Sequence, residues 1–392
     1  MSNDSKLEIL LSTKPRYRKA SKKGKKIILD EFCTLCQYNR KYAIRLFNKA
    51  NPSKKYSHVY SQRGRKKKYN NPMIHSILKD LWVATNLPCS RRLKVIIPLW
   101  LPHYRKQLIT QEVYDQLFSI SPATIDRMMA PARSKFNKKG FTTTKPGSII
   151  KKQIPIKTNQ WDEIKPGFIE ADTVAHCGSS TLGPFVLTVN CVDISTTWTV
   201  QRAVWGKGER GVLNAISQIE KTLPFPILGF DCDNGSEFLN WPIYKYFTHR
   251  KRSVQFTRSR AYMKNDNAHI ENKNWTHIRQ YLGYQRFDQP QIIDKLNDLY
   301  ANEWNLYFNF FIPSAKLIDK IRVKSKTIKK LDKPKTPFQR IIESPYIPVE
   351  TKNQLRKQFR QLDPFELQKI MSQKIRDILN LVHQSTVIHL ST

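Results

Sequence analysis

The spacing of hydrophobic and polar positions changes along the chain. In the N-terminal part, apolar residues recur at helical intervals in three segments: 27–49, 73–101 and 110–136. Further on, β-branched and aromatic runs predict three successive strands, over 167–174, 185–195 and 196–205. The pattern therefore predicts a helical N-terminal part followed by a region that contains a sheet.

Helices and strands alternate after these three strands. A helical pattern over 209–222 precedes the strand "PILGFDCD" (226–233), and a helix near 237–248 precedes the strand "SVQFTRS" (253–259). A further helix contains "KNDNAHIENKNW" (264–275). Three strands followed by this alternation indicate an α/β layer with a mixed sheet, so the predicted fold class is multidomain α+β.

The first helical segment divides into two stripes around a short polar break. The expected stripe residues are Ile27, Ile28, Phe32 and Leu35, then Tyr42, Ile44, Leu46 and Phe47. Arg40, Lys41 and Arg45 lie on the second helix. This arrangement is typical of a helix-turn-helix that offers its second helix to the DNA major groove, although an ordinary helical hairpin with solvated basic residues also fits.

The third helical segment has the clearest local signals. Ser121 is a candidate N-cap, Pro122 occupies the first helical position, and Ile120 can pack against Ile125. Thr124 and Arg127 are then expected to face outward from a recognition helix. The segment 73–140 is thus predicted to be a second helix-turn-helix unit.

The basic run "RGRKKKY" (63–69) separates the two helical units. Such runs are usually linkers that touch phosphates, and Arg63 and Arg65 could also enter a minor groove. The expected order is a first unit at 1–62, a linker at 63–72, the second unit at 73–140 and another linker at 141–164. A core at 165–300 and a basic C-terminal region with terminal helices at 301–392 complete it.

Charge is distributed unevenly along the chain. Residues 1–164 carry 35 Lys+Arg against 10 Asp+Glu, a net charge of +25, whereas residues 165–300 carry 16 against 13, a net of +3. Residues 301–392 carry 17 against 8, a net of +9. Basic flanks around a nearly neutral centre are expected when the flanks hold a nucleic-acid backbone and the centre uses carboxylates.

Cysteine usage and hydropathy bear on the cellular compartment. Cys33 and Cys36 form a CxxC, but no second pair at zinc-finger spacing follows, so buried thiols are favoured over a zinc site. We see no signal peptide and no apolar run long enough to span a bilayer, so no membrane partner is expected. A cytoplasmic location is expected, associated with the bacterial nucleoid when the protein is bound to DNA.

The carboxylates of the central region form two pairs. Strand alternation puts Glu170 and Asp172 on one face of their strand, and Asp231 and Asp233 on one face of theirs. Together with Glu271 on a helix, they could converge on hard cations such as Mg²⁺ or Mn²⁺. Alternatively, these acids are strand-end caps and surface charges.

Three linked motifs carry a family resemblance: "EADT" around Asp172, "DNGSEF" at 233–238, and "KNDNAHIENKN" at 264–274. There are 60 residues between Asp172 and Asp233, and 37 between Asp233 and Glu271. In these motifs, their spacing and the order of elements, the chain resembles DDE transposases and retroviral-type integrases, specifically bacterial insertion-sequence transposases with an integrase catalytic core. It lacks the N-terminal His-His-Cys-Cys zinc module of the retroviral proteins.

The resemblance implies a ribonuclease H-like core in which Asp172, Asp233 and Glu271 bind two Mg²⁺ (or Mn²⁺) ions. It also implies cleavage at the 3′ ends of a mobile element, strand transfer into target DNA, and a homo-oligomer that brings two ends together. Two rivals stay open: a ribonuclease H-like nuclease without strand transfer, and a catalytically inactive DNA-binding relative.

Several neighbours of the triad are candidates for weaker roles. Arg258, Arg260, Lys264 and Lys273 could hold DNA phosphates, or could simply be solvated. Asn267 lies one helical turn before Glu271 and could touch the DNA end or a metal-bound water. His176 and His269 could assist proton transfer, although lone histidines are more often structural.

Overall fold

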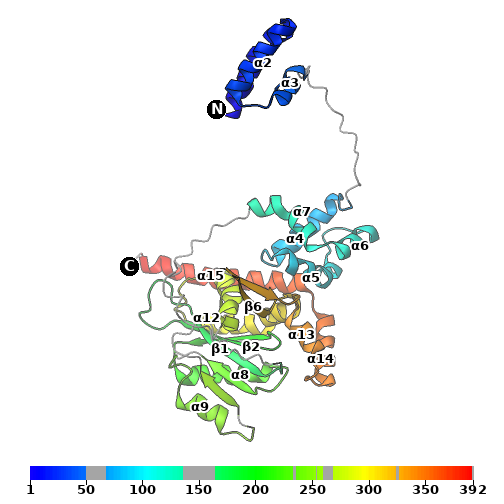
Figure 1. Cartoon of the computed structure of the whole chain (residues 1–392). Helices are drawn as coiled ribbons and strands as arrows, with labels where there is room; N and C mark the ends of the chain where they lie inside the picture. The colour runs from blue at the N-terminus through cyan, green and yellow to red at the C-terminus, as the bar shows by residue number, and fades with distance from the viewer. Residues whose placement is uncertain are drawn as a thin grey trace. The chain divides into compact units, whose positions relative to one another are not determined.

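The chain forms two compact units, residues 1–67 and 68–392, in a computed structural model (Figure 1). The structure describes residues 1–49, 68–135, 164–232, 235–252, 254–258, 268–323 and 326–390. Six residues with a predicted role lie outside these ranges: Arg63, Arg65, Asp233, Arg260, Lys264 and Asn267.

The first unit contains helices α1 (Asn3–Lys19), α2 (Lys22–Cys36) and α3 (Arg40–Asn48). Helix α1 was not predicted, and it changes which face of α2 is buried. Ile28, Leu29, Phe32 and Cys36 point inward, while Ile27 and Leu35 are 58% and 59% exposed. The expected stripe is therefore corrected, because α2 packs against both α1 and α3.

The second and third helical segments begin the other unit. They comprise α4 (Pro72–Ala84), α5 (Ser90–Trp100), the 3₁₀ turn η1 (Leu101–His103), α6 (Gln111–Ser119) and α7 (Pro122–Lys135). The predicted cap of α7 is present, since the backbone N–H of Thr124 donates to Ser121 Oγ at 3.2 Å. Ile120 and Ile125 are both buried, as their expected contact requires.

A mixed five-stranded sheet forms the centre of this unit, as the sequence pattern predicted. Its strands are β1 (Phe168–Ala175), β2 (Val186–Asp193), β3 (Thr199–Trp205), β4 (Gly229–Cys232) and β5 (Gln255–Arg258). They lie in the order β3-β2-β1-β4-β5. Neighbours β1–β2 and β2–β3 are antiparallel, whereas β1–β4 and β4–β5 are parallel.

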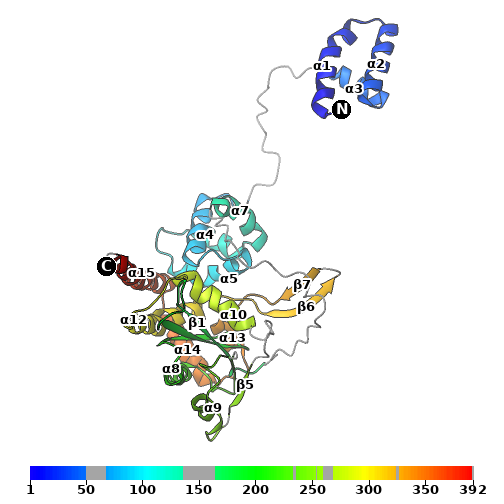
Figure 2. The same ribbon diagram turned by 90° about the vertical axis from the view of Figure 1, so that its left-hand side faces the viewer.

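Helices cover both faces of the sheet (Figure 2). Helices α8 (Glu209–Thr222) and α9 (Trp241–Thr248) lie on one face, and α10 (Ala268–Lys273) and α12 (Gln291–Leu299) lie on the other. Every residue of β2 is buried, as a central strand covered on both faces should be.

Two of these helices continue as π-helical turns. Helix α10 runs through η3 (Asn274–Arg279) into α11 (Gln280–Leu282). Helix α12 runs through η4 (Tyr300–Trp304) to η5 (Tyr307–Phe311), so the domain boundary expected at 300 falls inside one helical run. This run also joins the second helical segment to the core, because Tyr307 Oη donates to the carbonyl of Ala84 at 3.0 Å.

The C-terminal part comprises the antiparallel hairpin β6 (Leu317–Val323) and β7 (Lys326–Leu331), then α13 (Pro337–Glu343), α14 (Val349–Gln361) and α15 (Pro364–Leu390). The apolar periodicity seen over 355–382 thus spans two helices, which are separated at Leu362 and Asp363. Within the described ranges, no helix is both long and apolar enough to cross a bilayer.

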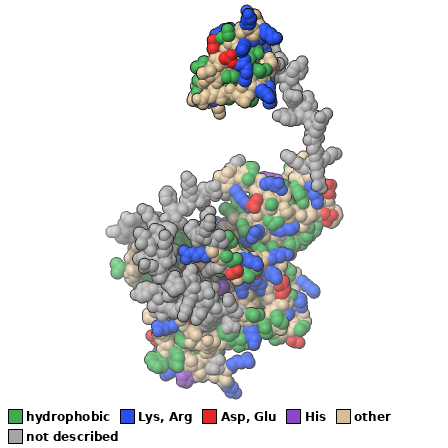
Figure 3. Space-filling model, in the orientation of Figure 1, with side chains coloured by type: hydrophobic (Ala, Val, Ile, Leu, Met, Phe, Trp, Pro, Cys, Tyr) green, Lys and Arg blue, Asp and Glu red, His purple; other side chains and the backbone are tan. Residues whose placement is uncertain are grey.

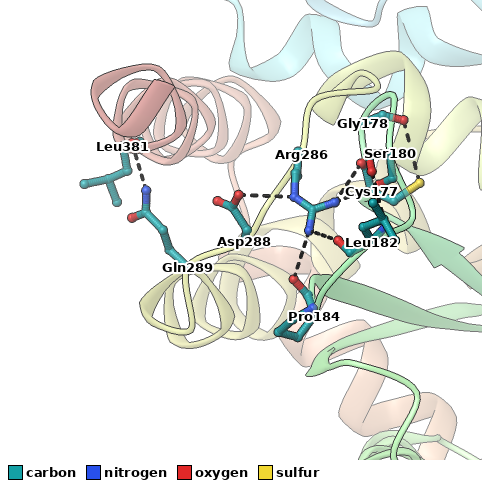
Figure 4. A network of polar contacts seen from close by, with 9 residues as sticks. All are labelled: Cys177, Gly178, Ser180, Leu182, Pro184, Arg286, Asp288, Gln289 and Leu381. Carbon is teal, nitrogen blue, oxygen red and sulfur yellow. Dashed lines mark hydrogen bonds and ion pairs between the residues drawn. The ribbon is translucent and has the colours of Figure 1, made fainter. Parts of the chain in front are cut away.

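Arg286 fixes the connection between β1 and β2 (Figure 4). Its guanidinium donates to the carbonyl oxygens of that connection: Cys177, Ser180, Leu182 and Pro184. It also forms an ion pair with Asp288 at 3.2 Å. A planar group with five donors suits this role, because it can satisfy several carbonyls at once.

Candidate active site

Acidic residues of β1 and β4 lie side by side on the sheet. The parallel register pairs Glu170 with Asp231, and both are buried, with 4% and 7% exposure. Thr257 Oγ1, on β5, donates to Asp231 Oδ1 at 2.6 Å. Asp231 is therefore held within the sheet by a neighbouring strand.

Glu170 contacts the helix that carries Glu271. Its Oε2 accepts a hydrogen bond from the backbone N–H of Ile270 at 3.1 Å. Burial, together with the charges of Asp231 and Glu271, raises the pKa of Glu170 to about 8, although the backbone donors of Ile270 and His269 oppose this rise. Carboxylates from β1, β4 and α10 thus share one neighbourhood.

Asp172 is half-buried, and both oxygens of its carboxylate have a donor. Oδ1 accepts from the backbone N–H of Thr173 at 2.7 Å, and Oδ2 accepts from Asn274 Nδ2 at 2.6 Å. Asn274 lies three residues after Glu271 on the same continuous helix. The helix that carries one predicted triad residue therefore orients another.

Two more amides extend this contact across the sheet. Asn190 Nδ2 donates to Asn274 Oδ1 at 2.7 Å, and Gln201 Nε2 donates to Asn190 Oδ1 at 2.8 Å. Asn190 lies opposite Asp172 in the β1–β2 register and opposite Gln201 in the β2–β3 register. We call Gln201, Asn190 and Asn274 the amide chain. Each amide donates toward Asp172, so the chain ends on an acceptor.

The local sequence pattern does not predict the amide chain. Asn274 lies within the third motif, which gives it no separate role, and Gln201 has no signal at all. One signal was available in Asn190, a polar residue in the middle of the apolar strand "VLTVNCVD". A fully buried amide requires partners, so its position marks a polar contact inside the core.

The second acid of the triad, Asp233, lies outside the described residues, but its flanks are described. Cys232 pairs with Ala171, the residue before Asp172. On the other side, Glu237 is buried and accepts a hydrogen bond from Thr173 Oγ1 at 3.1 Å. Both flanks of Asp233 are thus tied to β1 next to Asp172.

The donor chemistry of this site suits hard divalent cations. Within the described ranges, no group of three or more His, Cys, Asp and Glu side chains is arranged to hold a metal ion. Asp172 and Glu271 are described members of the predicted set, and Asp233 is not. Carboxylate oxygens are the ligands that Mg²⁺ and Mn²⁺ prefer, so the acids are of the right chemical type, and the binding of these ions stays a prediction.

Basic residues near the acids lie in different environments. Arg258 is exposed at the end of β5, whereas Lys273 is buried, with 6% exposure. The Nζ of Lys273 lies 3.3 Å from His277 Nε2, on the face of the helix opposite Glu271. Lys273 is therefore not a solvated side chain, and its contact with DNA phosphate stays a prediction.

The two histidines also differ in environment. His176 is fully buried, hydrogen-bonded to Thr188 Oγ1 at 2.9 Å and stacked on Phe287. Burial and the nearby Arg279 lower the pKa of His176 to about 3. His176 thus has the burial and contacts of a structural histidine, whereas the half-buried His269 donates its backbone N–H to Glu170.

In the N-terminal unit, several Lys and Arg side chains lie on the face in view in Figure 3, among hydrophobic and other residues. Lys41 and Arg45 are exposed on α3, while Arg40 forms an ion pair with Asp30 of α2. A DNA contact by these residues stays a prediction.

On α7, Thr124 and Arg127 lie in the first turns of the helix. Arg127 is exposed, and its guanidinium donates to Thr124 Oγ1 at 3.3 Å. The two side chains thus form one polar group at the start of the predicted recognition helix, and their role in reading DNA also stays a prediction.

Similar solved structures include retroviral integrases, at low similarity. One is the intasome of simian T-cell lymphotropic virus in complex with the PP2A regulatory subunit B56 gamma. It is 13% identical, covers 44% of this chain and 69% of that chain, and has a TM-score of 0.30. Another is the catalytic core domain of BIV integrase, 13% identical over 48% of this chain and 98% of that chain, with a TM-score of 0.27. Similarity this weak carries no argument about function.

No model of a known protein family matches the chain. A curated relative, the uncharacterized protein y4rM of Sinorhizobium fredii (strain NBRC 101917 / NGR234), is 34% identical over 345 residues. The match covers 87% of this chain and 96% of the relative. The chain therefore belongs to the same protein family as y4rM.

Proposed function

We propose that the chain is a DDE-type DNA transposase or integrase. In this proposal it binds the ends of a mobile element, cleaves at their 3′ ends and joins them to target DNA. The observation that carries the proposal is the pair of predicted triad residues linked by one helix: α10 bears Glu271, and its continuation bears Asn274, which donates to Asp172.

Asp172, Asp233 and Glu271 would hold two Mg²⁺ or Mn²⁺ ions. When bound, such ions activate an attacking oxygen and stabilise a leaving oxygen in phosphodiester transfer. The register supports the partnership of the first two acids, because Asp172 and Asp233 each follow one member of the paired residues Ala171 and Cys232.

The protein's own residues would act by positioning. Asn274 and the backbone N–H of Thr173 hold the Asp172 carboxylate in one orientation. Glu170 holds the start of α10 through the N–H of Ile270, and so sets the position of the helix that bears Glu271. Such preorganisation lowers the barrier without a covalent enzyme intermediate.

DNA and a second copy of the chain are the proposed partners. Both helical units and the basic C-terminal region would hold DNA, and synapsis of two ends would require an oligomer. The net charge of +37 supports a polyanionic partner.

The test is an assay with labelled DNA from the ends of the element, a target plasmid and Mg²⁺ or Mn²⁺. The sequences that flank the gene supply the ends. Wild-type protein should nick the ends and give joined product, while Asp172→Asn, Asp233→Asn and Glu271→Gln should each abolish both products.

Asp231→Asn is the matched control, because it alters an acid of the same strand motif and keeps the oxygen that accepts from Thr257. It should retain far more activity than Asp233→Asn. Cleavage without joined product would favour a nuclease that lacks strand transfer. DNA binding without cleavage at the authentic ends would favour an inactive relative.

A further inference from the structure

We call the continuous helix α10–η3–α11, which bears Glu271, the catalytic helix. A cavity of about 390 Å³ lies on the side of this helix that faces away from the acids. Several parts of the unit 68–392 line it, among them the connection between α4 and α5, the start of α5, the face of the catalytic helix that bears Lys273 and His277, and the segments that flank the β6–β7 hairpin. Glu271 and Asp172 are not among its lining residues. The cavity is therefore separate from the candidate active site.

Basic side chains gather in this cavity from two directions. Arg91 and Arg92 come from the start of α5, and Lys273 comes from the catalytic helix. Lys273 is buried, and its Nζ lies 3.3 Å from His277 Nε2. Considering the described residues alone, none of these three basic side chains forms an ion pair with a carboxylate.

One lining carboxylate, Asp332, is already engaged. Its Oδ2 forms an ion pair with Arg340 Nη1 at 2.7 Å, and its Oδ1 accepts from the backbone N–H of Lys316 at 2.6 Å. Asp332 thus pairs with Arg340, and within the described ranges it forms no ion pair with Arg91, Arg92 or Lys273. Gathering basic groups in a cavity without a counter-ion is unfavourable, and a bound anion would relieve that cost.

The size and the donors of the cavity indicate the kind of anion. An arginine fork with a neighbouring lysine is the combination that proteins use for phosphate oxygens. The volume is within the range of ligand pockets and exceeds what a single small ion needs. Arg91 and Asn272 are exposed, so the cavity is open to solvent at these residues.

We propose that this cavity binds a phosphate group, with Arg92 and Lys273 as the principal contacts. The phosphate belongs to the backbone of a DNA strand, and this choice of source rests on the proposed function. A strand held there would touch the second helical segment through Arg92 and the catalytic helix through Lys273. It would thus connect a predicted DNA reader with the core that acts on DNA.

Two variants test the cavity: Arg92→Gln, at a half-buried position, and Lys273→Met, which keeps an unbranched side chain of similar length. Arg105→Gln is the matched control, because Arg105 is 85% exposed and lies outside the cavity. All three proteins are first compared by thermal unfolding, so that a loss of binding is not confused with a loss of fold.

The first measurement is the affinity for a mixed-sequence DNA duplex as a function of salt concentration. Fluorescence anisotropy detects the binding, and the buffer contains no divalent metal. Loss of one phosphate contact should weaken binding about tenfold and reduce the slope of log K against log salt by about 0.9. The second measurement is calorimetric titration with pyrophosphate. Wild-type and Arg105→Gln proteins should bind it, and Arg92→Gln and Lys273→Met should not.

The outcomes separate the sources of the phosphate. Reduced DNA slopes in both cavity variants, with competition by pyrophosphate, support the DNA strand. Lost pyrophosphate binding with unchanged DNA slopes supports the phosphate site and overturns the DNA source. Unchanged behaviour in both measurements overturns the cavity as a phosphate site. Because neither measurement requires cleavage, an inactive triad would overturn the proposed function without affecting these results.

Discussion

Replacing Asn190 by leucine removes the middle of the amide chain that ends on Asp172. Asn190 is fully buried, donates to Asn274 and accepts from Gln201. Leucine has a similar volume and cannot make either bond. The substitution therefore isolates the polar contacts from the packing of β2.

The expected cost follows from the groups left behind. The carboxamide oxygen of Gln201 already lacks a partner in the described part of the chain, so losing Asn190 would leave the whole buried amide unpaired. Leaving a buried polar group without its hydrogen bond costs about 1–3 kcal/mol, and the cost for the half-buried Asn274 lies toward the lower end of this range. We expect the free energy of unfolding to fall by about 2–5 kcal/mol.

The effect on function should exceed a general loss of stability. Without Asn190, the Asn274 amide is free to rotate and no longer presents Nδ2 to Asp172. Removing a group that orients a metal ligand typically weakens metal affinity about 10–100-fold. Gln201→Met, which removes only the far end of the chain, should have a smaller effect on Mn²⁺ affinity than Asn190→Leu.

The assay pairs denaturant unfolding with calorimetric titration of Mn²⁺. Asn309→Leu is the matched control, since Asn309 is equally buried and bonds both backbone groups of Thr199 without contacting Asp172. It should lose comparable stability and keep the Mn²⁺ affinity. If Asn190→Leu and Asn309→Leu lose stability alike and bind Mn²⁺ alike, the amide chain does not position Asp172.

Three further predictions concern neighbouring groups. The pKa of His176 is about 3 in the folded state against an ordinary 6.5, so between these pH values the unfolded state binds a proton that the folded state does not. The free energy of unfolding should therefore fall by up to about 5 kcal/mol as the pH drops from 6.5 toward 3. His176→Phe should flatten this pH dependence, as measured by chemical denaturation. The pKa of Glu170 is raised from 4.5 to about 8, so the folded state retains a proton that the unfolded state releases. In metal-free buffer, the free energy of unfolding should decline as the pH rises through this interval. Glu170→Gln keeps an acceptor for Ile270 and should remove the decline, whereas an unchanged pH profile would contradict the assignment. Arg286→Lys offers fewer donors to the β1–β2 connection, so hydrogen exchange should accelerate at residues 177–184 while the protection of β2 is kept; equal exchange in both proteins would argue against the clamp.

Local chemistry made part of the fold predictable. The Ser121 cap needs only its own turn, and strand alternation alone placed Glu170 and Asp172 on one face. The succession of three strands was readable because β-branched runs are short and bounded. These signals require no knowledge of distant partners.

The rest depends on contacts between segments far apart in the sequence. Gln201 and Asn274 meet Asn190 only through strand register and helix docking, which the local pattern does not encode. The local pattern suggests that Leu35 is a core residue, but the packing of α1 on α2 buries a different face and leaves Leu35 exposed. The local pattern suggests that Lys273 is a surface residue, and only the fold shows that it is buried and lines a cavity with the α4–α5 connection.

The helix of residues 268–282 contributes residues to two sites, one on each of its sides. Glu271 and Asn274 belong to the side of the acids, and Lys273 and His277 belong to the side of the cavity. A ligand that shifts this helix from either side changes the free energy of binding on the other, and the coupling factor must be the same in both directions. If a DNA phosphate in the cavity raises the affinity of the acids for divalent ions, those ions must raise the affinity for the DNA by the same factor. A hydrolytic site that binds its ions only when DNA is bound would have little activity while the protein is alone.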